Sequence, residues 1–462
     1  MTLIKSISGI RGTIGGKPLE NLTPLDVVKY TAAYATWMME NSDEDNLTIV
    51  LGRDARVSGQ MLANIVASTF QGMGVNVIDL GLATTPTVEL AVVHLHTNGG
   101  IILTASHNPA EWNALKLLNE SGEFLSDSDG RKILELADND DYTFVSYDKL
   151  GKYSRNVEMN SIHIQNILNL SNVDINAIKR SDFTVAIDCV NSVGGIIIPE
   201  LLKALGVSKV ISLCCEPNGL FPHNPEPIPE NLTEISGLIK KEGADVGFVV
   251  DPDVDRLAIL NEDGSMFGEE YTLVAVADYI LKNKGKGNTV SNLSSTGALR
   301  DITEKYGGKY NAAAVGEVNV VKKMKETGAI IGGEGNGGVI YPELHYGRDA
   351  LVGIALFLTH LAKSGLKCSE LRASYPNYVI SKNKIELTPD VDVDEILKSV
   401  KEKYSNYPIN DIDGLKIHFE TEWVHLRKSN TEPIIRIYSE STTLKKAEDL
   451  AGKIISDIKS YI

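Results

Sequence analysis

The chain has 462 residues, which at roughly 150 residues per domain allows three or four domains. Hydrophobic residues make up 43% and charged residues 23%, which is ordinary for a globular protein and excludes wholesale disorder. The formal net charge of −16 argues against general binding to nucleic acid or to anionic membranes. An anionic ligand would therefore need basic side chains concentrated in one cleft.

Cysteine usage and the N-terminal sequence predict a cytoplasmic protein. The cysteines are too few and too irregularly spaced for a disulfide framework or a C-x-x-C zinc site: Cys189, Cys214, Cys215 and Cys368. Residues 1–6 contain no signal-peptide core, and no apolar stretch reaches the ~18 residues of a membrane span.

A strand–helix–strand pattern repeats along the chain. Its three copies open with apolar strands at residues 47–51, 184–187 and 289–293. In each copy, later helical segments lead to a third apolar strand, at residues 100–103, 246–250 and 329–331. Apolar strands that alternate with helices indicate α/β domains with largely parallel sheets covered on both faces.

Each third strand runs directly into a polar loop, at residues 104–109, 251–256 and 332–338. Open α/β sheets bind ligands at the carboxyl ends of their strands, so these loops are candidate site elements. Matching hairpin signals with Asn-Glu-Ser/Asp-Gly turns follow the first two loops, at residues 115–125 and 257–267. We therefore expect three related α/β domains, each presenting one loop.

The pattern changes from about Asn377. A strand at 379–387, a helix at 394–404, further strands and a last helix at 444–462 predict a smaller α+β domain. The expected division of the chain is 1–150, 151–256, 257–375 and 376–462.

Ser106 is predicted to lie between a buried strand and the start of a helix. Asn108 could cap this helix, Pro109 suits its first turn, and Glu111 would complete a capping box. A phosphate on Ser106 would be stabilised at such a helix start. No G-x-S-x-G elbow is present, which makes a hydrolase nucleophile a weak interpretation. Taken alone, Ser-His-Asn-Pro is better explained as a tight turn with caps.

Asp251, Asp253 and Asp255 alternate along the chain, so an extended backbone would point all three carboxylates the same way. Packed like charges are costly without a cation, which favours a divalent metal site over solvated turn acids. An EF-hand is excluded because Arg256 stands where that loop needs glycine. Three oxygen ligands with room for a phosphate oxygen suit Mg²⁺ better than a closed calcium site.

The glycine-rich loop at 332–338 carries Glu334 and Asn336. Glycines allow a close approach to a small polar ligand, whose hydroxyl or amine groups these two side chains could bind. A flexible surface turn explains this loop equally well.

The segment 427–433 concentrates cations and hydrogen-bond donors in an acidic chain. Arg427 is followed by Ser429, Asn430 and Thr431, which together could bind a phosphate. An ordinary exposed hairpin is the alternative.

Taken in order, these loops resemble the α-D-phosphohexomutase superfamily over essentially the whole chain. The serine loop matches its T-A-S-H-N-P, residues 251–256 match D-x-D-x-D-R, and residues 427–433 match R-x-S-x-T-E-P. Residues 9–12 also match a family signature, Gly-Ile-Arg-Gly. The resemblance implies three related α/β domains plus a smaller C-terminal α+β domain around a central cleft.

The resemblance also implies a mechanism. Ser106 is phosphorylated in the resting enzyme and binds one Mg²⁺ per chain through its phosphate, together with the three aspartates. It exchanges phosphate with a sugar monophosphate through a sugar bisphosphate, which acts as intermediate and activator. Arg11, His107 and Lys116 match positions that stabilise charge or transfer protons, without an assignment of acid and base. Arg256 matches a substrate-binding position.

Departures from the family pattern bear on the choice of sugar. In the glycine-rich loop, Asn336 replaces the serine usual in the family, and Gly338 stands where dual-specificity enzymes have histidine. Ala114 replaces the glycine that usually precedes Lys116. Residues 315–320, V-G-E-V-N-V, look more like phosphoglucosamine mutases. We therefore expect conversion of glucosamine-6-phosphate to glucosamine-1-phosphate, with a phosphoglucomutase/phosphomannomutase of dual hexose specificity as the alternative.

Two functions of other classes stay open at this point. A non-catalytic sugar-phosphate sensor is disfavoured because Ser106, the aspartates and Lys116 are all retained. A phosphatase would result if the phosphoserine were exposed to water. The expected partner is a small phosphosugar, with no nucleic acid and no membrane, and the expected assembly is a monomer or a homodimer.

Overall fold

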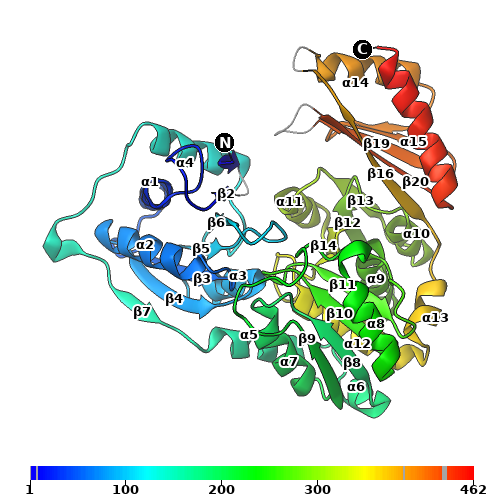
Figure 1. Ribbon diagram of the computed structural model, residues 1–462, viewed down its shortest axis with the longest axis horizontal. Coiled ribbons are helices and arrows are strands. Elements are labelled where there is room, and N and C mark those ends of the chain that lie inside the picture. Colours follow the sequence, from blue (N-terminus) through cyan, green and yellow to red (C-terminus); the bar gives the residue numbers. More distant parts are fainter. Residues whose placement is uncertain (1, 7–8, 389–390, 429–433, 462) are drawn as a thin grey trace. The chain divides into compact units, whose positions relative to one another are not determined.

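The structure is a computed structural model that describes residues 2–6, 9–388, 391–428 and 434–461 (Figure 1). The chain divides into two compact units. The first comprises Met1–Tyr279 and Asn336–Leu371, and the second comprises Ile280–Gly335 and Arg372–Ile462. No helix within the described ranges is long and apolar enough to cross a membrane.

The first sheet has seven strands in the order β1-β2-β6-β5-β3-β4-β7. Its strands are β1 (Ile4–Ser6), β2 (Gly9–Thr13), β3 (Thr48–Arg53), β4 (Asn76–Leu82), β5 (Gly99–Leu103), β6 (Trp112–Leu118) and β7 (Tyr153–Arg155). Strands β5, β3, β4 and β7 are parallel, whereas β6 returns antiparallel to β5. A bridge between Leu118 and Phe124 closes the first predicted hairpin.

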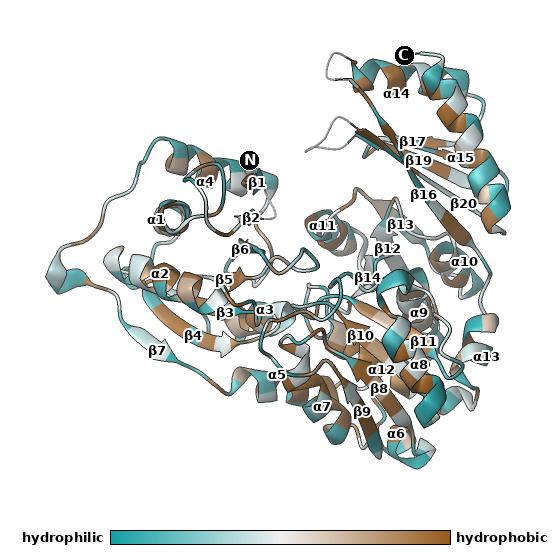
Figure 2. Ribbon diagram, viewed as in Figure 1, coloured by the Kyte–Doolittle hydropathy of each residue, from teal (hydrophilic) through white to brown (hydrophobic). Residues whose placement is uncertain are grey.

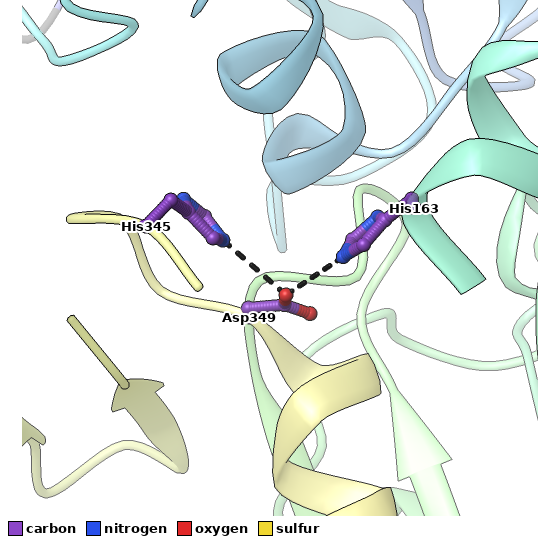
Figure 3. A group of neighbouring side chains, drawn as sticks. All are labelled: His163, His345 and Asp349. Carbon is purple, nitrogen blue, oxygen red and sulfur yellow. Dashed lines mark hydrogen bonds and ion pairs between the residues drawn. The ribbon is translucent and has the colours of Figure 1, made fainter. Parts of the chain in front are cut away.

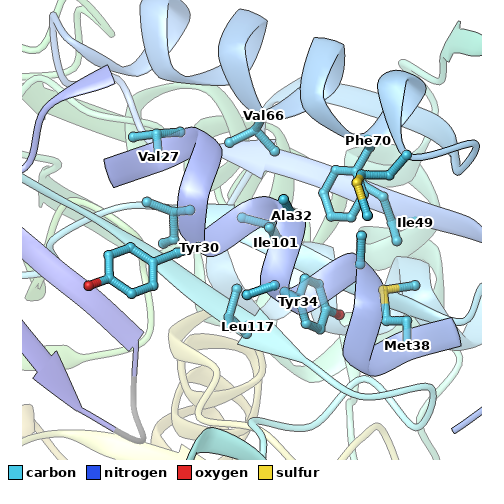
Figure 4. Packing of buried hydrophobic residues seen from close by; sticks show 14 of the residues in the cluster. Val27, Tyr30, Ala32, Tyr34, Met38, Ile49, Val66, Phe70, Ile101 and Leu117 are labelled. Carbon is cyan, nitrogen blue, oxygen red and sulfur yellow. The ribbon is translucent and has the colours of Figure 1, made fainter. Parts of the chain in front are cut away.

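Helices cover both faces of this sheet, as predicted. Residues 49 and 51 of β3 contribute to a core with α1 (Pro24–Glu40), α2 (Gly59–Gly72) and α4 (Asp127–Asp138), shown in Figure 4. The intervening Val50 packs on the opposite face, with α3 (Thr85–His94) and the start of α5 (Met159–Leu168). Successive strand residues point to opposite faces, so a strand that is apolar throughout must be covered on both sides.

The second sheet has the order β11-β10-β8-β9. Its strands are β8 (Thr184–Asp188), β9 (Lys209–Leu213), β10 (Val246–Val250) and β11 (Leu257–Asn261), and α6 (Ile175–Ser181), α7 (Gly194–Ala204) and α8 (Thr233–Glu242) are its helices. Figure 2 shows these strands as predominantly hydrophobic. Strand β11 pairs antiparallel with β10, so a boundary at residue 256 divides this hairpin. The four-domain division itself stays a prediction.

The third repeat contributes to both compact units. In the second unit, β12 (Asn288–Asn292) pairs in parallel with β13 (Tyr310–Ala313) and β14 (Ala329–Glu334), and α10 (Ala298–Lys305) and α11 (Glu317–Thr327) connect them. The first unit contains β15 (Gly338–Ile340) and α12 (Ala350–Ser364), which packs against α5 and α6. Helices α9 (Glu269–Lys284) and α13 (Cys368–Ala373) each span a point of division.

The C-terminal part is an antiparallel sheet with helices, which confirms the predicted α+β class. Strand order is β16-β20-β19-β18-β17. The elements are β16 (Val379–Glu386), α14 (Val393–Lys403), β17 (Ile409–Asn410), β18 (Leu415–His418), β19 (Trp423–Lys428), β20 (Ile434–Ser441) and α15 (Leu444–Lys459). One face of α14 and α15 packs on the sheet in a separate core.

Candidate active site

The loop after β5 carries Ser106, and no helix follows it. The chain makes a turn and enters β6 at Trp112, so the predicted helix start is wrong: Asn108 caps no helix and Glu111 completes no capping box. The backbone of Ser106 has a φ of +49°, in the left-handed region that non-glycine residues seldom adopt. The alternative of a tight turn is the one that the structure bears out.

A buried arginine explains why this loop is a turn. Arg56 follows β3, and its guanidinium donates hydrogen bonds to the backbone carbonyls of Ser106, Asn108, Pro109 and Trp112. Its Nε also donates to Asp54 at 3.0 Å. Carbonyls that a helix would have satisfied are therefore satisfied by one side chain. Arg56 was not predicted to be a site residue. The signal was available, because Asp54 and Arg56 follow the carboxyl end of the strand predicted at 47–51, just as the other candidate loops follow their strands.

The side chain of Ser106 faces the aspartate loop. Its Oγ donates to Oδ2 of Asp251 at 2.7 Å and lies 3.4 Å from Nδ1 of His107. Ser106 and Asp251, which are 145 residues apart in the chain, therefore meet within the first unit.

The three aspartates converge through a turn and not through extended backbone. Val254 has a φ of +63°, and its N–H donates to the carbonyl of Asp251 at 3.1 Å. This corrects the geometry that we expected, while the expected convergence holds. Each of Asp251, Asp253 and Asp255 is fully buried, and each offers an oxygen within 4.8 Å of the others.

Asp253 and Asp255 each keep one oxygen that accepts no hydrogen bond within the described residues, although Nε of Arg256 lies 3.8 Å from Oδ1 of Asp255. Lys116 lies 2.7 Å from Oδ2 of Asp253 and 3.8 Å from Oδ2 of Asp255. Thr85 also donates to Oδ2 of Asp253, and Arg348 donates to Oδ2 of Asp255. The Oδ1 atoms of Asp253 and Asp255 are buried and have no hydrogen-bond donor within the described residues. Buried anionic oxygens without donors suit a hard divalent cation. Thr85 and Arg348 were not identified from the sequence.

The charges of this cluster are unevenly compensated. Burial and the neighbouring carboxylates raise the pKa of Asp251 well above its usual value. Burial also opposes ionisation of Asp253, but Lys116 and Thr85 hold the pKa of Asp253 below its usual value. Burial disfavours the Lys116 ammonium, yet Asp253 and Asp255 hold the pKa of Lys116 above its usual value. The carboxylate that faces Ser106 is therefore the one most in need of a cation.

His107, Arg256 and Arg11 lie on the elements around this cluster. Burial and the nearby cations, Arg256 first, lower the pKa of His107 to about 3, so its imidazole is neutral at physiological pH. The backbone N–H of Arg256 donates to Oδ1 of Asp251 at 3.2 Å. Arg11 lies on β2, opposite Ala114 of β6, the strand that carries Lys116.

Glu334 and Asn336, the two polar residues of the glycine-rich loop, belong to different compact units. Glu334 ends β14 in the second unit and is buried, which is inconsistent with a flexible surface turn at this residue. Its Oε1 accepts hydrogen bonds from Asn292 at 2.8 Å and from the backbone N–H of Gly316 at 3.1 Å. Asn336 belongs to the first unit, where its Oδ1 accepts from the N–H of Gly338. Asn292 was missed in the sequence.

Arg427 lies on β19 in the second unit. Its Nε contacts Oδ2 of Asp413 at 2.9 Å, and the same oxygen accepts a hydrogen bond from the N–H of Val315. Ser429, Asn430 and Thr431 lie outside the described residues.

Four family models match the chain in order. Three are the alpha/beta/alpha domains I, II and III of phosphoglucomutase/phosphomannomutase, at residues 3–144, 161–264 and 268–378. The fourth is the C-terminal domain of the same family, at residues 383–456.

Individual proteins are similar over almost their full length. A phosphoglucomutase/phosphomannomutase of Thermococcus kodakarensis is 37% identical over 443 residues, 95% of this chain and 96% of its own. A phosphoglucosamine/phosphogalactosamine mutase of Sulfurisphaera tokodaii is 33% identical, with 98% of each chain covered. A family member of Burkholderia thailandensis shares the fold, with a TM-score of 0.86, 24% identity and coverage of 99% and 98%.

Proposed function

This chain belongs to the phosphoglucomutase/phosphomannomutase family, the α-D-phosphohexomutases, and is an intramolecular phosphotransferase; we propose that it interconverts glucosamine-6-phosphate and glucosamine-1-phosphate through a phosphoserine at Ser106. The observation that carries the mechanism is the hydrogen bond from Ser106 to Asp251, which lies beside two further buried carboxylates, Asp253 and Asp255. A phosphoglucomutase/phosphomannomutase of dual hexose specificity has equal support, because relatives of both kinds match the chain.

Phosphorylation of Ser106 creates the need for a metal. In the unphosphorylated protein, the hydroxyl of Ser106 donates a hydrogen bond to Asp251. Replacing the hydroxyl proton with a phosphoryl group removes this donor and adds a dianion beside a buried carboxylate. Asp251, Asp253, Asp255 and the phosphate on Ser106 would hold one Mg²⁺ per chain. The bound ion would neutralise the phosphoryl oxygens and make Ser106 a better leaving group.

The transfer requires one hydroxyl of the sugar to attack the phosphorus of the phosphoserine. The bond from phosphorus to Ser106 Oγ breaks, the proton of the sugar hydroxyl ends on Ser106 Oγ, and a sugar bisphosphate forms. The bisphosphate then reorients in the site, and its other phosphate is transferred to Ser106. Atoms balance over the cycle, and the enzyme ends phosphorylated as it began.

Lys116 and His107 take distinct parts in this proposal. Lys116 is held as an ammonium by Asp253 and Asp255, so we assign it to stabilising charge on the transferred phosphoryl group. His107 is neutral and close to Ser106, which leaves it able to donate or accept a hydrogen bond without adding charge. Arg11 and Arg256 would add cationic groups that bind substrate phosphate.

The sugar would be bound by Glu334 and Asn336, and the phosphate not in transfer by Arg427, Ser429, Asn430 and Thr431. Glu334 is held by the N–H of Gly316, so residues 315–320 bear directly on the carboxylate that would bind sugar hydroxyls or an amine. This contact supports the preference for glucosamine phosphate, because the segment resembles that of phosphoglucosamine mutases. Whether the protein is a monomer or a homodimer stays a prediction.

One comparison of substrates tests the choice of sugar. We expect kcat/KM for glucosamine-6-phosphate to exceed the values for glucose-1-phosphate and mannose-1-phosphate on one preparation, with a trace of the matching bisphosphate. A clear preference for either neutral hexose phosphate would favour dual specificity. Binding without turnover would favour a sensor, and steady release of inorganic phosphate would favour a phosphatase.

A further inference from the structure

A second group of metal-ligating side chains lies in the first unit, apart from the aspartate loop. Figure 3 shows the imidazoles of His163 and His345 pointing at the carboxylate of Asp349. The Nε2 atoms lie 2.9 Å (His163) and 3.3 Å (His345) from the same oxygen, Oδ2. All three residues offer a ligand atom within 4.8 Å of the others.

The fold holds one carboxylate oxygen toward the two imidazoles. Asp349 is the N-cap of α12, and its Oδ1 accepts from the backbone N–H groups of Leu351 and Val352. This leaves Oδ2 for the histidines. His163 lies on α5 and is fully buried, as is Asp349, while His345 lies in the loop before α12 and is nearly buried.

The other nitrogen of each imidazole meets a polar side chain of α3. Nδ1 of His163 lies 2.9 Å from the hydroxyl of Thr87, and Nδ1 of His345 lies 3.4 Å from Oε2 of Glu89. Metal-bound histidines characteristically have their second nitrogen held by a carboxylate, a carbonyl or another polar group, which fixes the orientation of the ring. Here the hydroxyl of Thr87 holds the ring of His163, a carboxylate lies beside Nδ1 of His345, and the Nε2 atoms of both rings face one carboxylate oxygen.

The charges of the cluster match a divalent cation. Two buried carboxylates, Asp349 and Glu89, accompany two imidazoles. Two carboxylates and one divalent ion balance in charge, whereas without an ion the two carboxylates share a buried environment.

We propose that His163, His345 and Asp349 bind a divalent transition metal, for which Zn²⁺ is the probe. Imidazole nitrogens favour zinc and its neighbours over magnesium, so this site is chemically distinct from the aspartate loop. Zinc bonds of about 2.0–2.2 Å at tetrahedral angles place ligand atoms about 3.3–3.5 Å apart. The pair at 3.3 Å already fits, and the pair at 2.9 Å needs to lengthen by a few tenths of an ångström.

A different cluster, Asp188, Cys214 and His223, is a weaker candidate. Burial and Asp188 raise the pKa of the Cys214 thiol to about 12, and a metal ligand must be the thiolate. His223 is also more exposed than His163 and His345. This cluster therefore provides a control.

The proposed site would join elements that also support the catalytic loop. Thr85 at the start of α3 bonds to Asp253 through both its backbone N–H and its hydroxyl. The N–H of Ala350, next to Asp349, donates to the carbonyl of Val254 at 3.2 Å. A metal held between α3, α5 and α12 would fix the positions of the segments on which the aspartate turn rests.

Zinc stoichiometry tests the proposal. Full-length protein is stripped with a chelator, equilibrated with saturating Mg²⁺ and titrated with Zn²⁺, and bound zinc is measured by elemental analysis. We expect one zinc per chain in the unchanged protein and in the controls His223→Gln and His360→Gln. His360 is a matched control because it is a buried histidine 3.4 Å from an aspartate, Asp278, outside the cluster. We expect His345→Gln to lose this zinc.

A second measurement separates ligands from their supporting residues. Glu89→Gln should keep the site but weaken zinc affinity by about 10–100-fold, as loss of an outer-shell partner does. Co²⁺ in place of Zn²⁺ should show the intense visible absorption of a four-coordinate site, absent in His345→Gln. If His345→Gln does not fold by circular dichroism, Glu89→Gln decides the test.

Two outcomes would overturn the proposal. One is unchanged protein that binds no zinc at stoichiometric concentrations, which would identify the cluster as a metal-free hydrogen-bond network. The other is undiminished zinc affinity in both His345→Gln and Glu89→Gln. Because the readout is bound metal, either result leaves the mutase function to its own assay.

Discussion

Two buried carboxylate sites, the aspartate turn and Glu334, differ in how their charge is compensated. In the aspartate turn, the Oδ1 atoms of Asp253 and Asp255 accept no hydrogen bond from the described part of the chain, and the pKa of Asp251 is raised. Glu334 instead accepts two N–H groups at one oxygen, from Asn292 and Gly316. A buried carboxylate that accepts hydrogen bonds from amide groups is therefore oriented to bind a neutral or cationic ligand. A buried carboxylate with an oxygen that accepts no hydrogen bond is better suited to bind a metal ion.

Removing the hydroxyl of Ser106 should have the largest effect. Ser106→Ala cannot carry the phosphoryl group, so we expect mutase activity to fall by at least about 10³-fold. Peptide mass mapping should find phosphate on residue 106 of the unchanged protein and none in the variant. A variant with full activity would show that phosphate is not transferred through this residue.

Removing the metal tests the aspartate turn as a metal site. EDTA should reduce activity to background and Mg²⁺ should restore it, because three buried carboxylates and a phosphate dianion leave negative charge that only a cation balances. Asp253→Asn should raise the Mg²⁺ concentration needed for half-maximal activity. Activity indifferent to chelation in the unchanged protein would contradict the metal site.

Arg56 tests how the serine turn is held. Arg56→Lys leaves most of the carbonyls of Ser106, Asn108, Pro109 and Trp112 without a donor, so we expect the free energy of unfolding to fall by about 3–5 kcal/mol. Arg53→Lys is the control, since the side chain of Arg53 is partly exposed and contacts Gln60. Urea unfolding measures both, and equal losses in the two variants would rule out a special role for Arg56.

Arg427 tests the predicted phosphate anchor. Losing a charge-assisted hydrogen bond costs about 1.5–3 kcal/mol, which corresponds to about 10–150-fold. Arg427→Ala should raise KM by this factor for 1-phospho and 6-phospho sugars alike, while Ser106 stays phosphorylated. An unchanged KM would place the anchor on other residues.

Substitution of Asn292 tests how Glu334 is held by its amide donors, and it should have the smallest effect. Asn292→Ala removes a side-chain donor to Glu334, so we expect kcat/KM to fall by about 10-fold, with Mg²⁺ dependence unchanged. Asn288→Ala is matched, because Asn288 lies on the same strand and donates to the carbonyl of Thr327, away from Glu334. Equal losses in both variants would indicate damage to β12 and not a role in holding Glu334.

The sequence by itself determined most of the strands and helices and the places where the site loops begin. Strands predicted at residues 47–51, 184–187 and 246–250 are observed within a residue or two, as β3, β8 and β10. These predictions succeed because side-chain periodicity and turn residues act over a few positions in the chain. Each site loop begins at the carboxyl end of a strand in its own sheet, which is where α/β sheets bind ligands, so the residue types of the site were also readable.

Only the tertiary structure decided the conformation of those loops and their partners. The helix predicted after Ser106 is replaced by a turn because Arg56, 50 residues earlier, satisfies its carbonyls. Lys116 reaches Asp253 across 137 residues, and Asp349 meets His163 across 186. No local pattern encodes such pairs. These pairs depend on which elements pack together. Once the polar groups are buried, each needs a hydrogen-bond partner, because a buried polar group without one costs free energy.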